Sequence, residues 1–190
     1  MGRPAGMPVR PCILIPVYNN ARTIEKVVRG VRAYVSDILV VDDGSTDATG
    51  ATLDRLASAG LLQLRRLPCN EGKGVALATG FAAARDSGFT HALQVDGDAQ
   101  HDLSCIPSFL EAARRDPQAL VLGFPVFDDS VPWIRAQGRK LSQFLVHVET
   151  GGRVITDPLI GFRVYPLTAT LAAGARGRRM YIDIEIAVRM

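Results

Sequence analysis

Two unbroken apolar segments constrain the fold of this chain more than any other feature of its sequence. Residues 12–17 read CILIPV, and residues 38–43 read ILVVDD. Runs without polar alternation are typical of strands that are covered on both faces, as in parallel sheets. Further candidate strands are LLQLRRL (61–67), HALQV (91–95) and ALVLGF (119–124).

Helical patterns separate these strands. In the first of them, apolar residues recur on one face, at Ile24, Val27, Val28, Val31 and Val35. A second helix carries Leu53 and Leu56 and ends at Gly60, a third follows NEGKG (70–74), and a fourth follows Pro107. This alternation predicts the α/β class, with a mostly parallel sheet and helices on both faces.

The chain of 190 residues has the length of one domain, which we expect over residues 11–190 after a flexible tail at 1–10. The net charge of +3 is small, and the arginines near the end lack interleaved aromatic residues, so we expect no nucleic-acid partner. No apolar run reaches the roughly 18 residues of a membrane span. Residues 181–190 are an apolar, structured-looking segment, so we expect the natural protein to continue beyond Met190.

The three cysteines, Cys12, Cys69 and Cys105, are widely spaced and form no metal-binding motif. They indicate a reduced compartment, and we expect a cytoplasmic protein.

Polar clusters follow three of the predicted strands: VYNN (17–20), DDGSTD (42–47) and DGDAQH (96–101). In an open α/β sheet, ligands bind beyond the carboxyl ends of the strands, which is where these clusters fall. Each cluster alone is compatible with an ordinary turn, whereas the three together favour a binding site.

Asp96 and Asp98 flank Gly97 in the last of these clusters. Two carboxylates in such a turn suit Mg²⁺ or Mn²⁺, which prefer oxygen ligands and complete their shell with phosphate oxygens. The alternative is an acidic turn that caps the next helix. The phosphate-binding glycine motifs of dinucleotide-binding and P-loop proteins are absent from the sequence.

Five motifs in order resemble those of the family 2 glycosyltransferases with the GT-A fold: IPVYNN, VVDDGSTD, NEGKG, VDGDAQH and DPLIGFRVYP. The similarity is greatest to the dolichol-phosphate mannose synthase-like branch, and it covers about residues 11–190. It implies an inverting, metal-dependent enzyme that moves a sugar from a nucleotide-diphosphate donor to a polyprenyl phosphate or to a glycan or lipid hydroxyl.

The resemblance also implies roles for single residues. Those implied to bind the donor are Pro16, Tyr18, Asn20, Val41, Asp42, Asp43, Asp96, Gly97, Asp98, Gln100 and Arg163. Tyr18 is expected to stack on the base, and Asp96 and Asp98 to hold the metal. Two alternatives stay open, since Tyr18 also suits a packed edge position and Asp43 also suits a cap on the next helix.

The remaining candidate residues depend on whether the acceptor is a hydroxyl or a lipid phosphate. A hydroxyl acceptor needs a general base, for which Asp157 is the candidate. A lipid phosphate is already an anion and needs cations instead, and Arg135, Arg139 and Ser142 fall on one face of a predicted helix. Such a face also suits a solvated surface. An acceptor lipid would bring the protein to the inner face of the membrane.

Asp183 and Glu185 resemble a late acidic motif of related transferases. Two other functions remain as alternatives. A nucleotidyltransferase also builds a metal site on an α/β sheet, but it normally has a glycine-rich basic signature where this chain has IPVYNN. A non-catalytic nucleotide-sugar-binding module would be favoured by loss of the aspartate pair, and the pair is intact.

Overall fold

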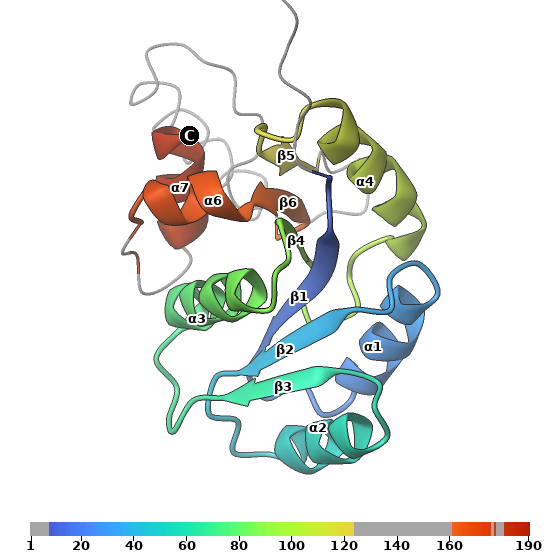
Figure 1. The fold of residues 1–190 in the computed structure, drawn as a ribbon. Coiled ribbons are helices and arrows are strands. Elements are labelled where there is room, and N and C mark those ends of the chain that lie inside the picture. The colour runs from blue at the N-terminus through green and yellow to red at the C-terminus, as the bar shows by residue number, and fades with distance from the viewer. Residues whose placement is uncertain (1–7, 124–160, 176, 178–180) are drawn as a thin grey trace, which may run out of the picture.

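The structure of the protein is a computed structural model, which describes residues 8–123, 161–175, 177 and 181–190 (Figure 1). The strands of this part form one sheet in the order β3-β2-β1-β4-β6-β5. Their bounds are Pro11–Val17 for β1, Ile38–Asp42 for β2, Gln63–Arg66 for β3, His91–Gln94 for β4, Val121–Leu122 for β5 and Arg163–Pro166 for β6.

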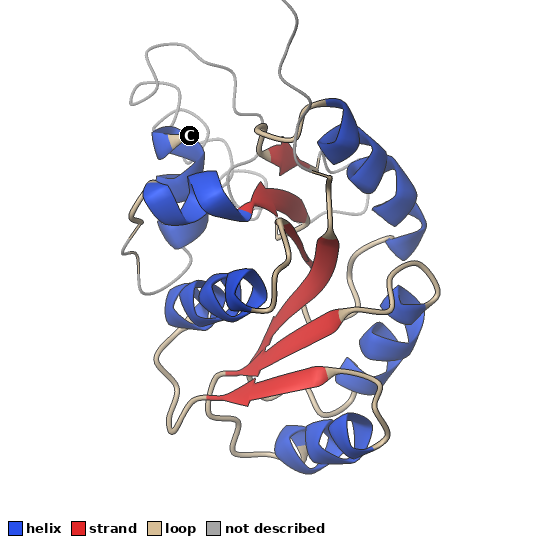
Figure 2. Cartoon of the chain, in the orientation of Figure 1, coloured by secondary structure: helices blue, strands red, loops and turns tan. Residues whose placement is uncertain are grey.

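Helices connect the strands and cover both faces of the sheet (Figure 2). Their bounds are Ile24–Arg32 for α1, Thr49–Ser58 for α2, Lys73–Asp86 for α3, Ile106–Arg115 for α4, Leu167–Ala172 for α6 and Tyr181–Arg189 for α7, with a short 3₁₀ turn, η1, at Leu103–Cys105. No helix of this described part combines the length and hydropathy that crossing a lipid bilayer requires.

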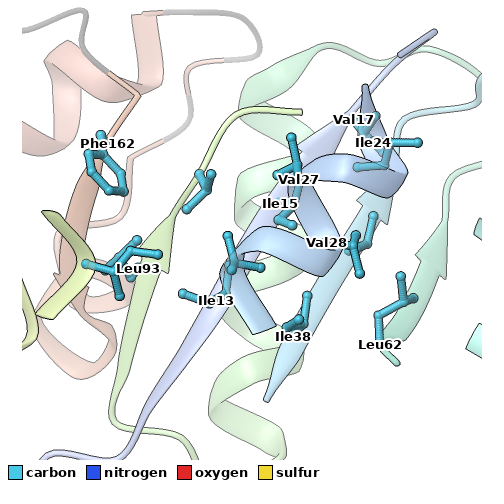
Figure 3. Close-up of a cluster of buried hydrophobic side chains, with 14 of the residues drawn as sticks. Ile13, Ile15, Val17, Ile24, Val27, Val28, Ile38, Leu62, Leu93 and Phe162 are labelled. Atoms are coloured by element: carbon cyan, nitrogen blue, oxygen red, sulfur yellow. The ribbon is translucent and has the colours of Figure 1, made fainter. Parts of the chain in front are cut away.

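Strand β1 shows why the sheet needs cover on both sides. Ile13 and Ile15 point into a core formed with α1, α2 and α4, of which Figure 3 shows a close-up. Cys12 and Leu14 point to the opposite face, into a second core formed with α3, α6 and α7. Alternate side chains of a strand face opposite ways, so an unbroken apolar run requires two cores.

Helix α3 packs close to β1 because of one glycine. A Cβ atom at Gly80 would collide with the side chain of Leu14, which is fully buried. The glycine therefore sets the distance between this helix and the sheet, and with it the position of the first turn of α3 near the ends of the strands.

The predicted architecture is confirmed, with one difference in strand direction. β1 pairs in parallel with β2 and β4, and β2 pairs in parallel with β3. β6 runs antiparallel to both β4 and β5, and the sequence did not predict it as a strand. Its four residues, RVYP, include Arg163 and Tyr165, so the segment has too few apolar residues to be recognised. Helix α1 also ends at Arg32, before Val35.

Candidate active site

A hollow of about 590 Å³ lies at the carboxyl ends of β1, β2 and β4. Since β1 lies between β2 and β4 in parallel register, the three polar clusters meet at one edge of the sheet. The predicted donor-binding residues that line the hollow are Pro16, Tyr18, Asn20, Asp43, Asp96, Gly97 and Asp98. The others that line it had no individual role assigned from the sequence, although all but Ala76 belong to the VYNN and NEGKG motifs: Val17, Asn70, Gly72, Lys73 and Ala76.

The loop after β1 forms the exposed wall of this hollow. Tyr18 is 42% exposed, so its ring is open to a planar ligand. Asn19 adopts a left-handed φ of 53°, and its Oδ1 atom accepts a hydrogen bond from the backbone N–H of Thr46 at 2.8 Å. That bond joins the loop after β1 to the loop after β2, so the two polar clusters hold each other in place.

Asp42, the last residue of β2, and Asp43, which follows it, make different contacts. Asp42 is fully buried and accepts hydrogen bonds from Arg66 Nε at 2.8 Å and from the Ser45 N–H at 2.9 Å. Neither Asp42 nor the buried Val41 lines the hollow. Their contact with a donor stays a prediction, and in the structure Asp42 fixes the turn after β2.

Asp43 lines the hollow and is also nearly buried, at 3% exposed. Its two carboxylate oxygens accept hydrogen bonds from the backbone N–H groups of Glu71 (2.8 Å) and Gly72 (2.9 Å). Asp43 therefore supports the loop that leads into α3, and not the helix that follows it in the chain.

Among the carboxylates that line the hollow, Asp96 has the most polar side-chain neighbours. Its Oδ1 atom lies 2.9 Å from Lys73 Nζ and 3.0 Å from Gln94 Nε2, and its Oδ2 atom lies 3.5 Å from His101 Nε2. Burial raises the pKa of this carboxyl, but the neighbouring His101 and Lys73 outweigh burial and hold the pKa well below its usual range. Asp96 is therefore ionised, as a metal ligand must be.

Two residues of the GFR motif at 161–163, Gly161 and Phe162, support Asp96 without binding it directly. A Cβ atom at residue 161 would collide with the Asp96 carboxylate, so only glycine lets the chain pass there. The ring of Phe162 stacks on His101, with centroids 4.9 Å apart and an interplanar angle of 15°, and this contact holds the imidazole beside Asp96.

Arg163 is fully buried and does not line the hollow. One guanidinium nitrogen donates a 2.8 Å hydrogen bond to the backbone carbonyl of Asp183, so the arginine joins β6 to α7. The contact of Arg163 with a donor stays a prediction.

Asp98 lies on the open side of the site. Its Oδ1 atom accepts a hydrogen bond from the Gln100 N–H at 3.0 Å, and Ala99 between them has a left-handed φ of 62°. Gln100 is exposed and does not line the hollow. The tight turn presents the Asp98 carboxylate to the hollow from the edge of the sheet.

The donor set of this site fits a hard divalent cation that shares its shell with a ligand. Among the described residues, no group of three or more His, Cys, Asp or Glu side chains is placed to hold a metal ion. Mg²⁺ is commonly bound through one or two carboxylates with phosphate oxygens and water completing the shell. Asp96 and Asp98 supply that number of carboxylates on the wall of a hollow large enough for a diphosphate.

Lys73 is the residue of this site whose contacts the sequence did not reveal. It begins α3, and its ammonium reaches both Asp96 and, at 3.7 Å, Asp183 Oδ2. The NEGKG motif was visible in the sequence, but a single lysine in a glycine-rich loop gives no indication of its partners.

The remaining predicted residues lie outside the described part of the chain. They are the candidate base Asp157 and the candidate phosphate-binding residues Arg135, Arg139 and Ser142.

Comparison with known proteins identifies the family. The family model described as glycosyl transferase family 2 matches residues 12–186. The chain belongs to glycosyl transferase family 2. The resemblance drawn from the five motifs is confirmed.

Two relatives show which members of the family this chain is similar to. The undecaprenyl-phosphate mannosyltransferase of Micrococcus luteus is 27% identical over 83% of this chain and 66% of its own length. The polyprenol monophosphomannose synthase of Mycolicibacterium smegmatis is 32% identical over 82% of this chain and 61% of its own length. The chain thus spans less than two thirds of either relative.

Solved structures confirm the fold. Glucosyl-3-phosphoglycerate synthase of Mycobacterium tuberculosis in complex with UDP superposes with a TM-score of 0.70 at 19% identity, over 98% of this chain and 70% of that one. Its complex with phosphoglyceric acid gives a TM-score of 0.71 at 18% identity, over 98% and 70% of the two chains. The GT-A fold expected for this chain is confirmed.

Proposed function

We propose that the protein is a metal-dependent, inverting glycosyltransferase that moves a sugar from a nucleotide-diphosphate donor to a polyprenyl phosphate. One observation carries the proposal. In a family 2 chain, Asp96 and Asp98 lie on the wall of a hollow at the carboxyl ends of three parallel strands, and the exposed Tyr18 lines the same hollow.

Some residues of the hollow bind the base of the donor, and others bind its diphosphate. Tyr18 stacks on the base, and Asn20 lines the same hollow as Asp96. Asp96 and Asp98 would hold Mg²⁺ or Mn²⁺. That cation would supply positive charge to stabilise the leaving diphosphate.

The first turn of α3 supports the same end of the donor. Gly72 and Lys73 line the hollow beside Asp96, and the free N–H groups at the start of a helix favour a phosphate. Asp43 keeps this turn in place through its bonds to Glu71 and Gly72. An anionic leaving group thus meets oriented dipoles as well as the cation.

The names of the two relatives support a lipid phosphate as the acceptor, because both names combine a prenyl lipid, phosphate and mannose. A phosphate oxygen needs no general base, since it attacks the anomeric carbon as an anion and inverts it. Arg135, Arg139 and Ser142 receive that phosphate in this proposal, and the reaction takes place at the cytoplasmic face of the membrane.

A donor and acceptor screen tests the function. The thermal midpoint of the protein is followed with UDP- and GDP-sugars, each with Mn²⁺ and with chelator, and stabilising donors are then assayed for transfer to undecaprenyl phosphate. At about 100 times its Kd, a donor adds about 2.7 kcal/mol to the free energy of unfolding. We expect one nucleotide class to stabilise only with metal and to yield a glycosyl lipid phosphate. Stabilisation by no donor, or equal stabilisation in chelator, would contradict the proposal.

A further inference from the structure

Lys73 lies between two carboxylates that come from distant parts of the chain. Its Nζ atom is 2.9 Å from Asp96 Oδ1 on the loop after β4 and 3.7 Å from Asp183 Oδ2 on α7. The first distance is that of a charge-assisted hydrogen bond, whereas the second is too long for one. The ammonium is therefore bound to Asp96 and only near Asp183.

One carboxylate oxygen of Asp183 accepts no hydrogen bond from the described residues. Its side chain is 1% exposed, and its Oδ1 atom accepts a 2.9 Å hydrogen bond from the Tyr165 hydroxyl. Its Oδ2 atom has no hydrogen-bond partner among the described residues. Leaving a buried carboxylate oxygen without a donor is costly, so its position beside Lys73 needs a reason.

A chain of hydrogen-bonded, buried side chains connects the two carboxylates. Gln94 donates to Asp96 Oδ1 through Nε2, and its Oε1 atom lies 3.0 Å from the Tyr165 hydroxyl that also contacts Asp183. Gln94 and Tyr165 are fully buried on the paired strands β4 and β6. The two acceptors therefore stay in place while the lysine, which has the flexible side chain, is the group able to move.

A divalent cation on Asp96 and the ammonium of Lys73 compete for the same carboxylate. Two positive charges on one carboxyl group repel each other, and the site is partly shielded from water, since Asp96 and Lys73 are 27% and 22% exposed. This repulsion favours departure of the ammonium from Asp96 when the cation arrives. A displaced ammonium also needs a new partner, because burying it alone is unfavourable.

We propose that Lys73 occupies the cation position on Asp96 in the metal-free protein and moves to Asp183 Oδ2 when the divalent cation binds. The inference rests on the metal site of the proposed function. Asp183 is then a positioning residue, which accepts the displaced lysine and lowers the free-energy cost of loading the metal.

The test measures Mn²⁺ affinity without any nucleotide sugar, by the electron paramagnetic resonance signal of free Mn²⁺, for a double-mutant cycle of Lys73→Met and Asp183→Asn. Asparagine keeps the shape of Asp183 and the acceptor for Tyr165, and circular dichroism checks that each variant is folded.

The middle of the range of interaction energies measured for residues of one charge network corresponds to about a tenfold change in an equilibrium constant. We expect Lys73→Met to tighten Mn²⁺ binding by about that factor and Asp183→Asn to weaken it similarly. In the Lys73→Met background, Asp183→Asn should change the affinity less than about threefold, because no lysine remains to be displaced. As a second readout, the carboxyl ¹³C signal of Asp183 should shift on Mg²⁺ titration in the unsubstituted protein and not in Lys73→Met.

Three results would contradict the inference, and a fourth would contradict only the proposed activity. Weaker or unchanged Mn²⁺ binding by Lys73→Met would overturn the exchange. An equal effect of Asp183→Asn in both backgrounds would also overturn it, since Asp183 would then act through its charge alone. No Mn²⁺ binding to the unsubstituted protein would overturn the metal site together with this inference, whereas an intact cycle without sugar transfer would overturn only the proposed activity.

Discussion

The carboxylate of Asp43 accepts a 2.9 Å hydrogen bond from the backbone N–H of Gly72, and this bond attaches the start of α3 to the end of β2. Gly72 has a left-handed φ of 97°, a conformation that glycine adopts without strain. The position of Lys73, the next residue, therefore depends on a carboxylate far away in the sequence.

Replacing Asp43 by asparagine should destabilise the protein and loosen this turn. Asparagine has one acceptor oxygen where aspartate has two, so one of the N–H groups of Glu71 and Gly72 would face an NH₂ group. A buried donor without a partner costs about 1–3 kcal/mol. Urea unfolding measures the loss, with the exposed Asp86→Asn as the matched control. Equal stability of the two variants would show that the turn is held by other contacts.

Replacing Asp98 by asparagine should remove most metal-dependent donor binding. Mutation of groups that merely support metal ligands costs about 10- to 100-fold in affinity, so loss of a ligand should cost at least as much. Titration of the donor with and without Mn²⁺ measures the change. Asp102→Asn is the control, since Asp102 is exposed nearby and caps η1 through Ser104. Donor binding by Asp98→Asn that still depends fully on Mn²⁺ would contradict the assignment.

The pairing of Lys73 with Asp96 should appear in the pH dependence of stability. The pKa of Asp96 is held below its usual range of about 4, so ionised Asp96 adds stability above about pH 4, and this stability is lost as the pH falls below that value. Lys73→Met removes the ion pair and should lower the free energy of unfolding by about 1–2 kcal/mol at neutral pH.

The difference between Lys73→Met and the unsubstituted protein should then shrink on acidification below about pH 4. Urea unfolding between about pH 3 and 7 measures it. Lys26→Met, at an exposed position of α1, is the control. A difference that stays constant across this range would mean that Lys73 does not stabilise an ionised carboxylate.

The sequence predicted the strands that carry a strong apolar signal and missed the contacts that join them. β1 and β2 are continuous apolar runs, so their burial on both faces followed directly from composition. Tyr165 was not singled out and Asp183 was noted only as part of an acidic motif, because a polar residue in a short strand or helix becomes part of a network only through its partners in space. Asp42 and Asp43 also could not be distinguished, since two adjacent aspartates look the same in the sequence. Only the packing of the fold decides which of them lines the hollow.

Asp157 distinguishes the two classes of acceptor. With a hydroxyl acceptor, Asp157→Asn should lower the rate of transfer by about 10² to 10⁴ while donor binding stays intact, because a general base would be lost. With a lipid phosphate acceptor we expect a much smaller loss. Transfer rates with undecaprenyl phosphate and thermal shifts with donor measure the two effects. A full loss with the lipid phosphate would show that Asp157 takes part in that reaction too.

Substitution of Arg135 and Arg139 should show whether the acceptor is a lipid phosphate. Each charge-assisted hydrogen bond to a phosphate is worth about 1.5–3 kcal/mol, so replacing both arginines by glutamine should raise the KM for undecaprenyl phosphate at least about tenfold. Donor binding should not change, because the two arginines do not contact the nucleotide in this proposal. The control replaces Arg114 and Arg115 by glutamine, two exposed arginines on α4 that pair with Glu111. It removes the same charge from another surface, and so separates a specific phosphate site from general attraction to an anionic membrane. If the two double variants use undecaprenyl phosphate equally well, the arginine pair is solvated surface and a hydroxyl acceptor becomes the better proposal.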